Sequence, residues 1–97
     1  MRALYKEPGK PARFIDVENT LEALQEKVGG YIETVTVAPN ACIICNEEGR
    51  LRGMPYNMII RGVPFVGPIL VVGVDGEDYC DVPAVGFLYD MFVVAGR

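Results

Sequence analysis

The sequence has no histidine and no serine, and its only threonines are Thr20, Thr34 and Thr36. Histidine is the commonest general base near neutral pH and the usual activator of a serine or cysteine nucleophile. Acid–base work would fall to carboxylates, but Glu47–Glu48 and Glu77–Asp78 lie in segments typical of solvated turns. No P-loop, dinucleotide-binding glycine pattern or zinc-hydrolase motif is present. The sequence therefore predicts a protein that is not an enzyme and has no cofactor.

The sequence also lacks a basic excess and a long apolar run. Nine basic residues face 13 acidic ones, for a net charge of −4, whereas nucleic-acid binding needs a basic face. The N-terminus has no long apolar core of the kind found in signal peptides. The longest apolar-rich stretch, Val82–Ala95, is shorter than the ~20 residues of a membrane helix and contains Asp90. We expect no nucleic-acid partner, no membrane, and a cytoplasmic protein.

Cysteine is scarce, with three residues, and this odd number fits a reduced compartment better than a disulfide framework. Cys42 and Cys45 form a C-x-x-C pattern, but residues three apart on a strand point to opposite faces of a sheet. Their thiolates therefore cannot converge on one metal, and without histidine only Cys80 remains as a further soft ligand. The sequence predicts buried core thiols and no metal site.

The stretch Asn19–Val37 contains the clearest structural pattern of the chain. Asn19 is a favourable helix N-cap, and Glu22 completes a capping-box pattern three residues later. Apolar residues at Leu21, Leu24 and Val28 form one stripe that can pack on a sheet. Gly29 then supplies the left-handed conformation that ends a helix, and the β-branched residues from position 31 to position 37 indicate a strand.

The rest of the chain indicates a single α+β domain over residues 1–97, with a mixed, mainly antiparallel sheet of about five strands and two helices. The residues of Ala41–Cys45 are all apolar, which predicts a central strand that is buried on both faces. The other expected strands are Arg2–Lys6, Arg13–Val17, a short Arg50–Arg52 strand after a hairpin turn at Asn46–Gly49, Ile69–Val74, and Glu77–Cys80 as its return partner.

Two segments are unusually apolar for a chain of this size. Gly53–Pro68 has three glycines and three prolines, so it either contains a helical turn around Tyr56–Ile60 or packs on another subunit. Pro83–Val94 predicts a helix that is apolar nearly all round, and a small monomer can hardly cover such a helix. We therefore expect a homo-oligomer with an interface formed by Phe87, Leu88, Met91 and Phe92.

Three segments carry a resemblance to a known family: EPGK at Glu7–Lys10, LEALQEKVGGYIE at Leu21–Glu33 and NEEGRLRGMPYN at Asn46–Asn57. Together they resemble a family of small phage and mobile-element proteins called domain of unknown function 3846, and the similarity covers most of the chain. Members of that family often have arginine where this chain has Met58. The resemblance implies a fold and a viral or mobile-element context, in which the cytoplasm would be the cytosol of a host cell, but no established activity.

Between Gly49 and Val74 the only charged residues are Arg50, Arg52 and Arg61, so an acidic protein contains a locally positive segment. Arginine forks, amide donors and free backbone N–H groups are the means by which proteins recognise phosphate or carboxylate. This pattern predicts an anion site lined by Arg50, Arg52, Tyr56, Asn57 and Arg61. The simpler alternative is that Arg50 and Arg52 only flank a turn and pair with Glu47 or Glu48.

Two functions fit these patterns. The leading hypothesis is a non-catalytic accessory protein that sequesters a small anionic, nucleotide-like ligand, such as an immune signal, at an oligomer interface. The alternative is a protein–protein interaction module that acts on a host protein without a small ligand. The family context alone points to defence, and it does so by association.

Overall fold

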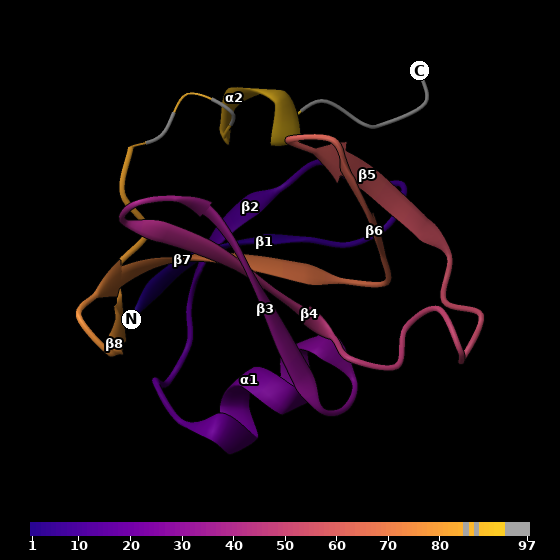
Figure 1. Ribbon diagram of the computed structural model, residues 1–97, viewed down its shortest axis with the longest axis horizontal. Coiled ribbons are helices and arrows are strands. Elements are labelled where there is room, and N and C mark those ends of the chain that lie inside the picture. Colours follow the sequence, from indigo (N-terminus) through magenta and orange to yellow (C-terminus); the bar gives the residue numbers. More distant parts are fainter. Residues whose placement is uncertain (85, 87, 93–97) are drawn as a thin grey trace.

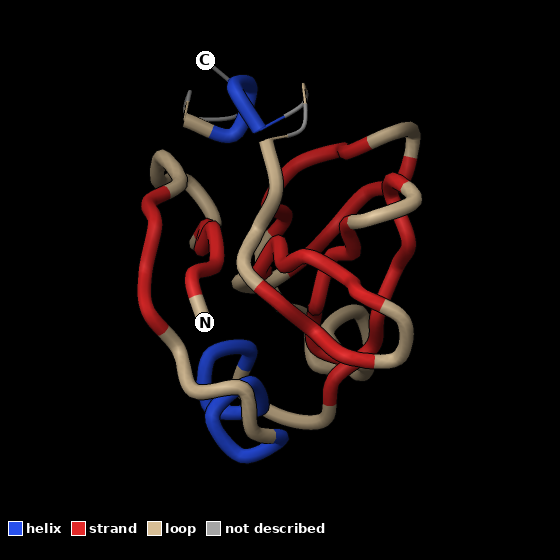
Figure 2. The backbone as a smooth tube through the Cα atoms, turned by 90° about the vertical axis from the view of Figure 1, so that its left-hand side faces the viewer, coloured by secondary structure: helices blue, strands red, loops and turns tan. Residues whose placement is uncertain are grey.

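The computed structural model describes residues 1–84, 86 and 88–92, and it has an antiparallel sheet as its middle layer (Figure 1). The strands are β1 (Arg2–Lys6), β2 (Arg13–Asp16), β3 (Ile32–Ala38), β4 (Ala41–Asn46), β5 (Tyr56–Ile60), β6 (Val63–Val66), β7 (Ile69–Asp75) and β8 (Asp78–Cys80). The helices are α1 (Leu21–Val28) and the single turn α2 (Leu88–Met91). Helix α1 covers one face of the sheet, and the β5–β6 hairpin and α2 cover the other (Figures 1 and 2).

The main sheet has the strand order β2-β1-β7-β4-β3, and β8 pairs with the far end of β7. Every pairing is antiparallel, which confirms the mainly antiparallel α+β prediction. The expected mixed sheet of about five strands with two helices is wrong in detail. The described residues form eight strands and one helix longer than a single turn. The difference arises because Gly53–Pro68 contains two strands and because only Leu88–Met91 of the expected C-terminal helix is helical.

Helix α1 begins one residue later than the capping pattern predicts. The Thr20 hydroxyl accepts a hydrogen bond from the Ala23 N–H at 3.2 Å, so Thr20 is the N-cap. The Asn19 amide instead donates to the Tyr79 carbonyl at 3.0 Å, which ties the helix entrance to β8. The predicted glycine stop is confirmed, because Gly29 has φ 81° and its N–H donates to the Gln25 carbonyl. Leu21 lies outside the buried stripe and is exposed.

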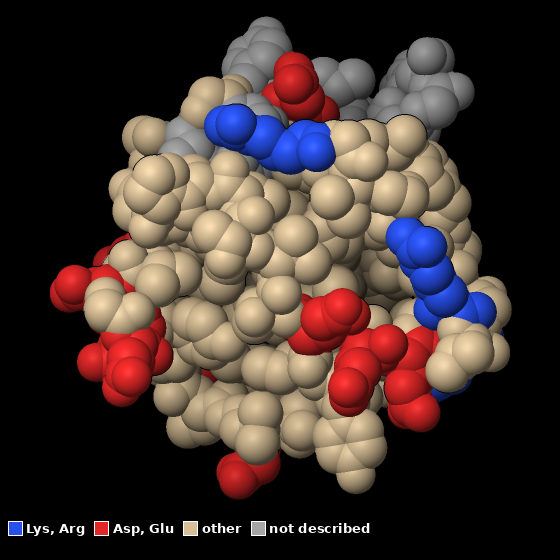
Figure 3. Space-filling model, in the orientation of Figure 1, with Lys and Arg blue, Asp and Glu red and all other residues tan. Residues whose placement is uncertain are grey.

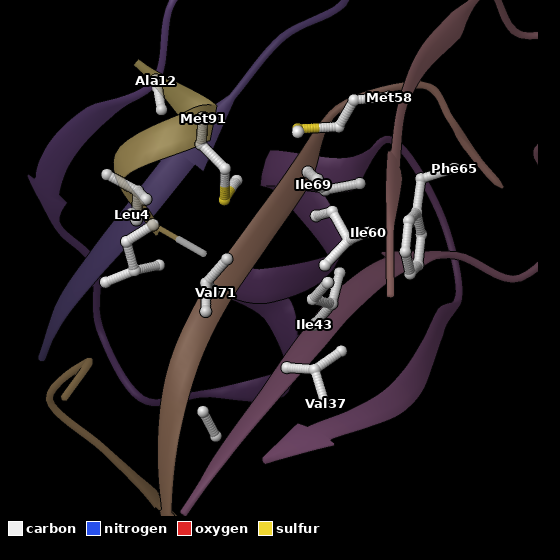
Figure 4. Close-up of a cluster of buried hydrophobic side chains, with 12 residues drawn as sticks. Leu4, Ala12, Val37, Ile43, Met58, Ile60, Phe65, Ile69, Val71 and Met91 are labelled. Atoms are coloured by element: carbon white, nitrogen blue, oxygen red, sulfur yellow. The ribbon is translucent and has the colours of Figure 1, made fainter. Parts of the chain in front are cut away.

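Two buried clusters lie on the two faces of the sheet. Strand β4 shows the division, because Cys42 and Ile44 contact the α1 side while Ala41 and Ile43 contact the hairpin side. The prediction that Ala41–Cys45 is buried on both faces is therefore confirmed. The hairpin-side cluster, shown in Figure 4, consists of Leu4, Ala12, Val37, Ala41, Ile43, Met58, Ile60, Phe65, Ile69, Val71, Leu88 and Met91.

The apolar segment after β4 is a β-hairpin and contains no helical turn. Ile60 faces Val63, and the two residues between them, Arg61 and Gly62, have φ 53° and 80°, as a two-residue hairpin turn requires. The segment is apolar because Met58, Ile60 and Phe65 pack onto the sheet of the same chain.

The short strand expected at Arg50–Arg52 is absent. The Arg52 N–H donates to the Glu48 carbonyl at 2.9 Å, and the Met54 N–H donates to the Gly49 carbonyl at 2.9 Å. These local hydrogen bonds wind residues 47–53 into consecutive turns. Gly53 ends these turns in the left-handed conformation, with φ 67°.

The long C-terminal helix predicted over Pro83–Val94 is also wrong in the described residues, where only Leu88–Met91 is helical. The Val82 N–H donates to the Arg2 carbonyl at 2.9 Å, so the chain first runs beside β1 and turns into α2 only after Gly86. Val85, Phe87, Val93 and Val94 lie outside the described residues. In the part of the chain that the structure describes, no helix is long and apolar enough to cross a membrane.

The side chains expected to form an oligomer interface have different surroundings. Leu88 and Met91 are buried in the hairpin-side cluster of their own chain, so they are not available to a second subunit in this arrangement. Phe92 is 41% exposed and packs on Phe14, with 5.6 Å between ring centroids. Phe87 lies outside the described residues. Of the four residues, Phe92 alone has a described, exposed side chain, and oligomerisation stays a prediction.

Candidate functional site

The five residues predicted to form an anion site do not line one cavity. Arg50 donates from Nη2 to the Pro64 carbonyl at 2.9 Å, which joins the 47–53 turns to β6. Arg52 donates from Nη1 to the Gly29 carbonyl at 2.7 Å, where it satisfies a carbonyl just beyond the C-terminus of α1. Neither arginine forms an ion pair with Glu47 or Glu48 among the described residues. Both arginines bind main-chain carbonyls at separate places.

The other three predicted residues are on the hairpin. Tyr56 is 53% exposed, whereas its neighbour Asn57 is only 1% exposed. Arg61 occupies the hairpin turn, at the opposite end of β5 from Tyr56. Asn57 is therefore unavailable to a ligand, and the remaining side chains are spread along the hairpin.

Asn57 instead forms a buried polar contact with Lys6. The Lys6 ammonium, which is fully buried, donates to Asn57 Oδ1 at 2.8 Å, and Asn57 Nδ2 donates to the carbonyls of Lys6 and Gly67 at 2.9 and 2.8 Å. Burial lowers the pKa of Lys6 from its ordinary value, because the charged form is poorly solvated there. No sequence pattern indicated this pair, since a lysine at the end of a strand is normally exposed. The contact fastens the hairpin to β1.

A surface cleft of about 320 Å³ lies where the hairpin leaves the β3 side of the sheet uncovered. We call it the β3–β6 cleft. Its lining residues come from β3, β4, β6 and the turns that follow β4, and they are Glu33, Val35, Cys45, Asn46, Glu47, Arg50, Leu51, Val63, Pro64, Phe65 and Val66. Figure 3 shows the corresponding hollow, with acidic side chains below it and a basic side chain at its right.

The charges of the cleft are arranged by strand register. Glu33 faces Cys45 across the β3–β4 ladder, and Glu47 lies two residues beyond Cys45. The carboxylates of Glu33 and Glu47 are thus diagonal neighbours on one rim, which we call the acidic rim. Neither carboxylate has an ion-pair partner among the described residues. Arg50 reaches β6 at the cleft, and its one hydrogen bond among the described residues, to the Pro64 carbonyl, leaves most of its guanidinium donors unused.

Sequence reasoning missed the acidic rim, although the sequence contained a signal for it. In the strand IETVTVA, Glu33 alternates with Val35 and Val37, so a carboxylate shares the face of two apolar residues. Val37 is buried in the hairpin-side cluster, Val35 packs against it, and Glu33 emerges at the rim. A carboxylate on the same face of a strand as buried residues indicates where the covering layer ends and the face becomes exposed.

Cys45 is a half-buried thiol in the cleft wall, and its sulfur donates to the Glu33 carbonyl at 3.6 Å. Burial raises the pKa of this thiol to about 11; the Glu33 carboxylate adds to the rise and Arg50 opposes it. The nucleophile is the thiolate, so this cysteine is nearly unreactive near neutral pH. The chemistry of the cleft is therefore that of charges and apolar contact.

We expect iodoacetamide to alkylate Cys45 at pH 8 about two hundredfold more slowly than a free thiol whose pKa is about 8.5. The rate should rise steadily with pH until about pH 11, where the thiol is half ionised. Mass spectrometry of the modified residue measures this rate, with free cysteine as the reference. A rate that levels off near pH 9 would show that the thiol has an ordinary pKa.

The other cysteines and carboxylates do not form a metal site in the described residues. Cys42 belongs to the α1-side cluster and Cys45 packs against the hairpin-side cluster, so the two thiols of the C-x-x-C pattern diverge as predicted. A second hollow, beside α1, contains the carboxylates of Asp16, Glu18, Glu22 and Glu26 and one cation, Lys27. It has no apolar floor comparable to the aromatic and aliphatic wall of β6.

Comparison with known proteins gives a family but no characterised relative. No curated protein and no solved structure shows a significant match to the chain. A family model described as a domain of unknown function, DUF3846, matches residues 1–93 of the 97. The match includes every strand, α1 and α2. The chain therefore belongs to the DUF3846 family.

Proposed function

We propose that this chain is a non-catalytic binding protein whose β3–β6 cleft holds a short segment of a partner protein through a basic side chain. The observation that carries the proposal is the acidic rim, where Glu33 and Glu47 lie beside an apolar floor and have no ion-pair partner among the described residues. A lysine or arginine can lay its aliphatic stem on Val35 and Val63 and place its charge at this rim.

The charge balance of the cleft supports one of the two functions expected from the sequence. A small anionic ligand would find one arginine, Arg50, and would face two carboxylates. Like charges in one site cost binding energy, so a nucleotide-like ligand is disfavoured there. A peptide satisfies both walls, because its basic side chain meets the acidic rim while a main-chain carbonyl accepts from Arg50. This chemistry favours the interaction module, and a phage or mobile-element origin would make its partner a host protein.

The test is a selection of short random peptides, displayed on phage, against the immobilised wild-type protein. We expect the enriched peptides to contain lysine or arginine flanked by apolar or β-branched residues. Enrichment of acidic peptides, or no enrichment at all, would contradict the proposal. A discrete nucleotide-sized mass retained by the purified protein in native mass spectrometry would then support the sequestration of a small anion.

The double variant Glu33→Gln/Glu47→Gln isolates the acidic rim. We expect it to bind the selected peptide about tenfold to a hundredfold more weakly than wild type, because each lost carboxylate removes attraction for the basic side chain. The matched control is Glu22→Gln/Glu26→Gln, which removes the same charge from the α1 hollow and should leave the affinity unchanged. Isothermal titration at low and moderate salt measures both, and equal losses in the two variants would mean that only the overall charge matters.

A further inference from the structure

Strand β3 ends the main sheet, and no described strand pairs with its outer side. We propose that this outer edge accepts the partner segment as an added β-strand, so that main-chain pairing fixes the register of the peptide and the β3–β6 cleft selects its side chain. The proposal rests on the peptide-binding function above and specifies how the peptide is held. Addition of a strand to an exposed edge is a general mode of peptide recognition.

The register shows which backbone groups face outward. The Glu47 N–H donates to the Tyr31 carbonyl at 2.8 Å, and the pairing Ile32↔Asn46 continues the same register. In an antiparallel ladder, directly bonded pairs alternate with non-bonded ones, so Glu33 and Val35 direct their backbone groups toward β4. Ile32, Thr34 and Thr36 then direct their N–H and C=O groups away from the sheet. No hydrogen bond from another described residue reaches these groups.

The backbone of this edge is open to strand pairing, and the one charged side chain of β3 is Glu33. Natural edge strands are guarded by lysine, proline, bulges or covering loops. Strand β3 reads IETVTVA and contains neither lysine nor proline, and its register shifts only between Thr36 and Ala38, beyond the outward groups. Five residues of regular edge from position 32 to position 36, four of them β-branched, therefore remain available along the cleft.

The side chains along β3 specify the occupant. An added strand places alternate residues on the cleft face, where a residue opposite or diagonal to Glu33 lies close enough for an ion pair. The occupant is therefore an extended segment with a lysine or arginine at that position. A second copy of β3 fits poorly, because it brings another Glu33 and no basic residue to an acidic rim.

The variant Thr34→Pro tests the edge directly. It removes one outward N–H and places the proline ring where the added strand would lie, yet it breaks no bond of the β3–β4 ladder. We expect the selected peptide to bind at least about tenfold more weakly. The control is Asp16→Pro on β2, the opposite edge strand, where Asp16 faces Arg2 in a non-bonded pair and its N–H points outward as well. This control should bind like wild type.

Amide hydrogen exchange of the wild-type protein supplies a second measurement that does not depend on the folding of a variant. We expect the saturating peptide to slow exchange at Ile32, Thr34 and Thr36 by about tenfold or more, and to leave the α1 amides unchanged. Unchanged exchange at β3, with wild-type affinity in Thr34→Pro, would overturn strand addition. If strand addition were overturned but Glu33→Gln/Glu47→Gln still bound the peptide more weakly, the peptide would bind in the cleft without pairing to β3. If that double variant also bound like wild type, the proposed function would fail as well.

Discussion

Replacing Asn57 with leucine is expected to lower the free energy of unfolding by about 3–5 kcal/mol. The substitution removes the acceptor of the fully buried Lys6 ammonium, whose other acceptor, the Glu7 carbonyl, lies at 3.5 Å. It also removes both donors that satisfy the carbonyls of Lys6 and Gly67. An uncompensated charge and the unpaired carbonyl of Gly67 then remain inside the protein, whereas the Lys6 carbonyl keeps its β-ladder pairing with Ile69. Urea unfolding, followed by circular dichroism, measures the loss.

The matched experiment is the double variant Lys6→Met/Asn57→Leu. Because it removes the buried charge together with its acceptor, we expect it to be more stable than Asn57→Leu alone, although the Gly67 carbonyl stays unpaired. Strict additivity of the single losses would contradict this account, since it would mean that the charge and the amide do not interact. Comparing the stabilities of the single and double variants shows whether Lys6 and Asn57 are energetically coupled in holding the hairpin against β1.

The second large effect is expected at Gly73, a β7 residue that faces Ala41 on β4 and Cys80 on β8. A Cβ atom at this position would overlap the main-chain carbonyl oxygen of Asp81 and lie 2.7 Å from Cys80 Sγ. Side chains can move away but this main chain cannot do so easily, because the next residue, Val82, is bonded to β1. We expect Gly73→Ala to cost about 2–4 kcal/mol of stability, measured by thermal or urea unfolding.

Gly76→Ala, in the turn between β7 and β8, is the control for Gly73→Ala. It distinguishes the cost of a steric overlap from the cost of an unfavourable backbone conformation. Gly76 has φ 64° and an added Cβ atom would meet nothing within 4 Å, so alanine there costs only the left-handed conformation, about 1 kcal/mol. A loss at Gly73 no larger than the loss at Gly76 would show that the strand accommodates a methyl group. That result would also mean that β8 is held less closely against β7 than the structure indicates.

The parts of the fold that sequence predicted are those with strong local patterns. The glycine stop at Gly29 and the all-apolar run of β4 each have one dominant local cause, and the structure confirms both. The hairpin from Tyr56 to Val66 was missed, although two β-rich runs separated by Arg61 and Gly62 are a recognisable hairpin pattern. The three glycines and three prolines of Gly53–Pro68 are typical of an irregular segment, and this signal outweighed the hairpin pattern.

Two further expectations depended on tertiary contacts. The apolar residues of Pro83–Val94 suggested a second subunit; Leu88 and Met91 cover the core of their own chain, and oligomerisation stays a prediction. The isolated arginines suggested one anion site, but Arg50 and Arg52 bind carbonyls of different elements. Local sequence cannot show which distant carbonyl a long side chain reaches. The acidic rim arises from the β3–β4 register, which the sequence does not specify on its own.

The central claim is that the β3–β6 cleft and the adjoining edge of β3 bind an extended basic segment. Chemical-shift mapping of the isotope-labelled protein, titrated with the most strongly selected peptide, tests it most directly. The account predicts that the largest shifts occur at the edge residues Ile32, Thr34 and Thr36 and at the cleft residues Glu33, Val35, Cys45 and Val63, and that residues of α1 do not respond. Shifts centred on the acidic hollow beside α1, or on the outer face of the hairpin, would contradict it.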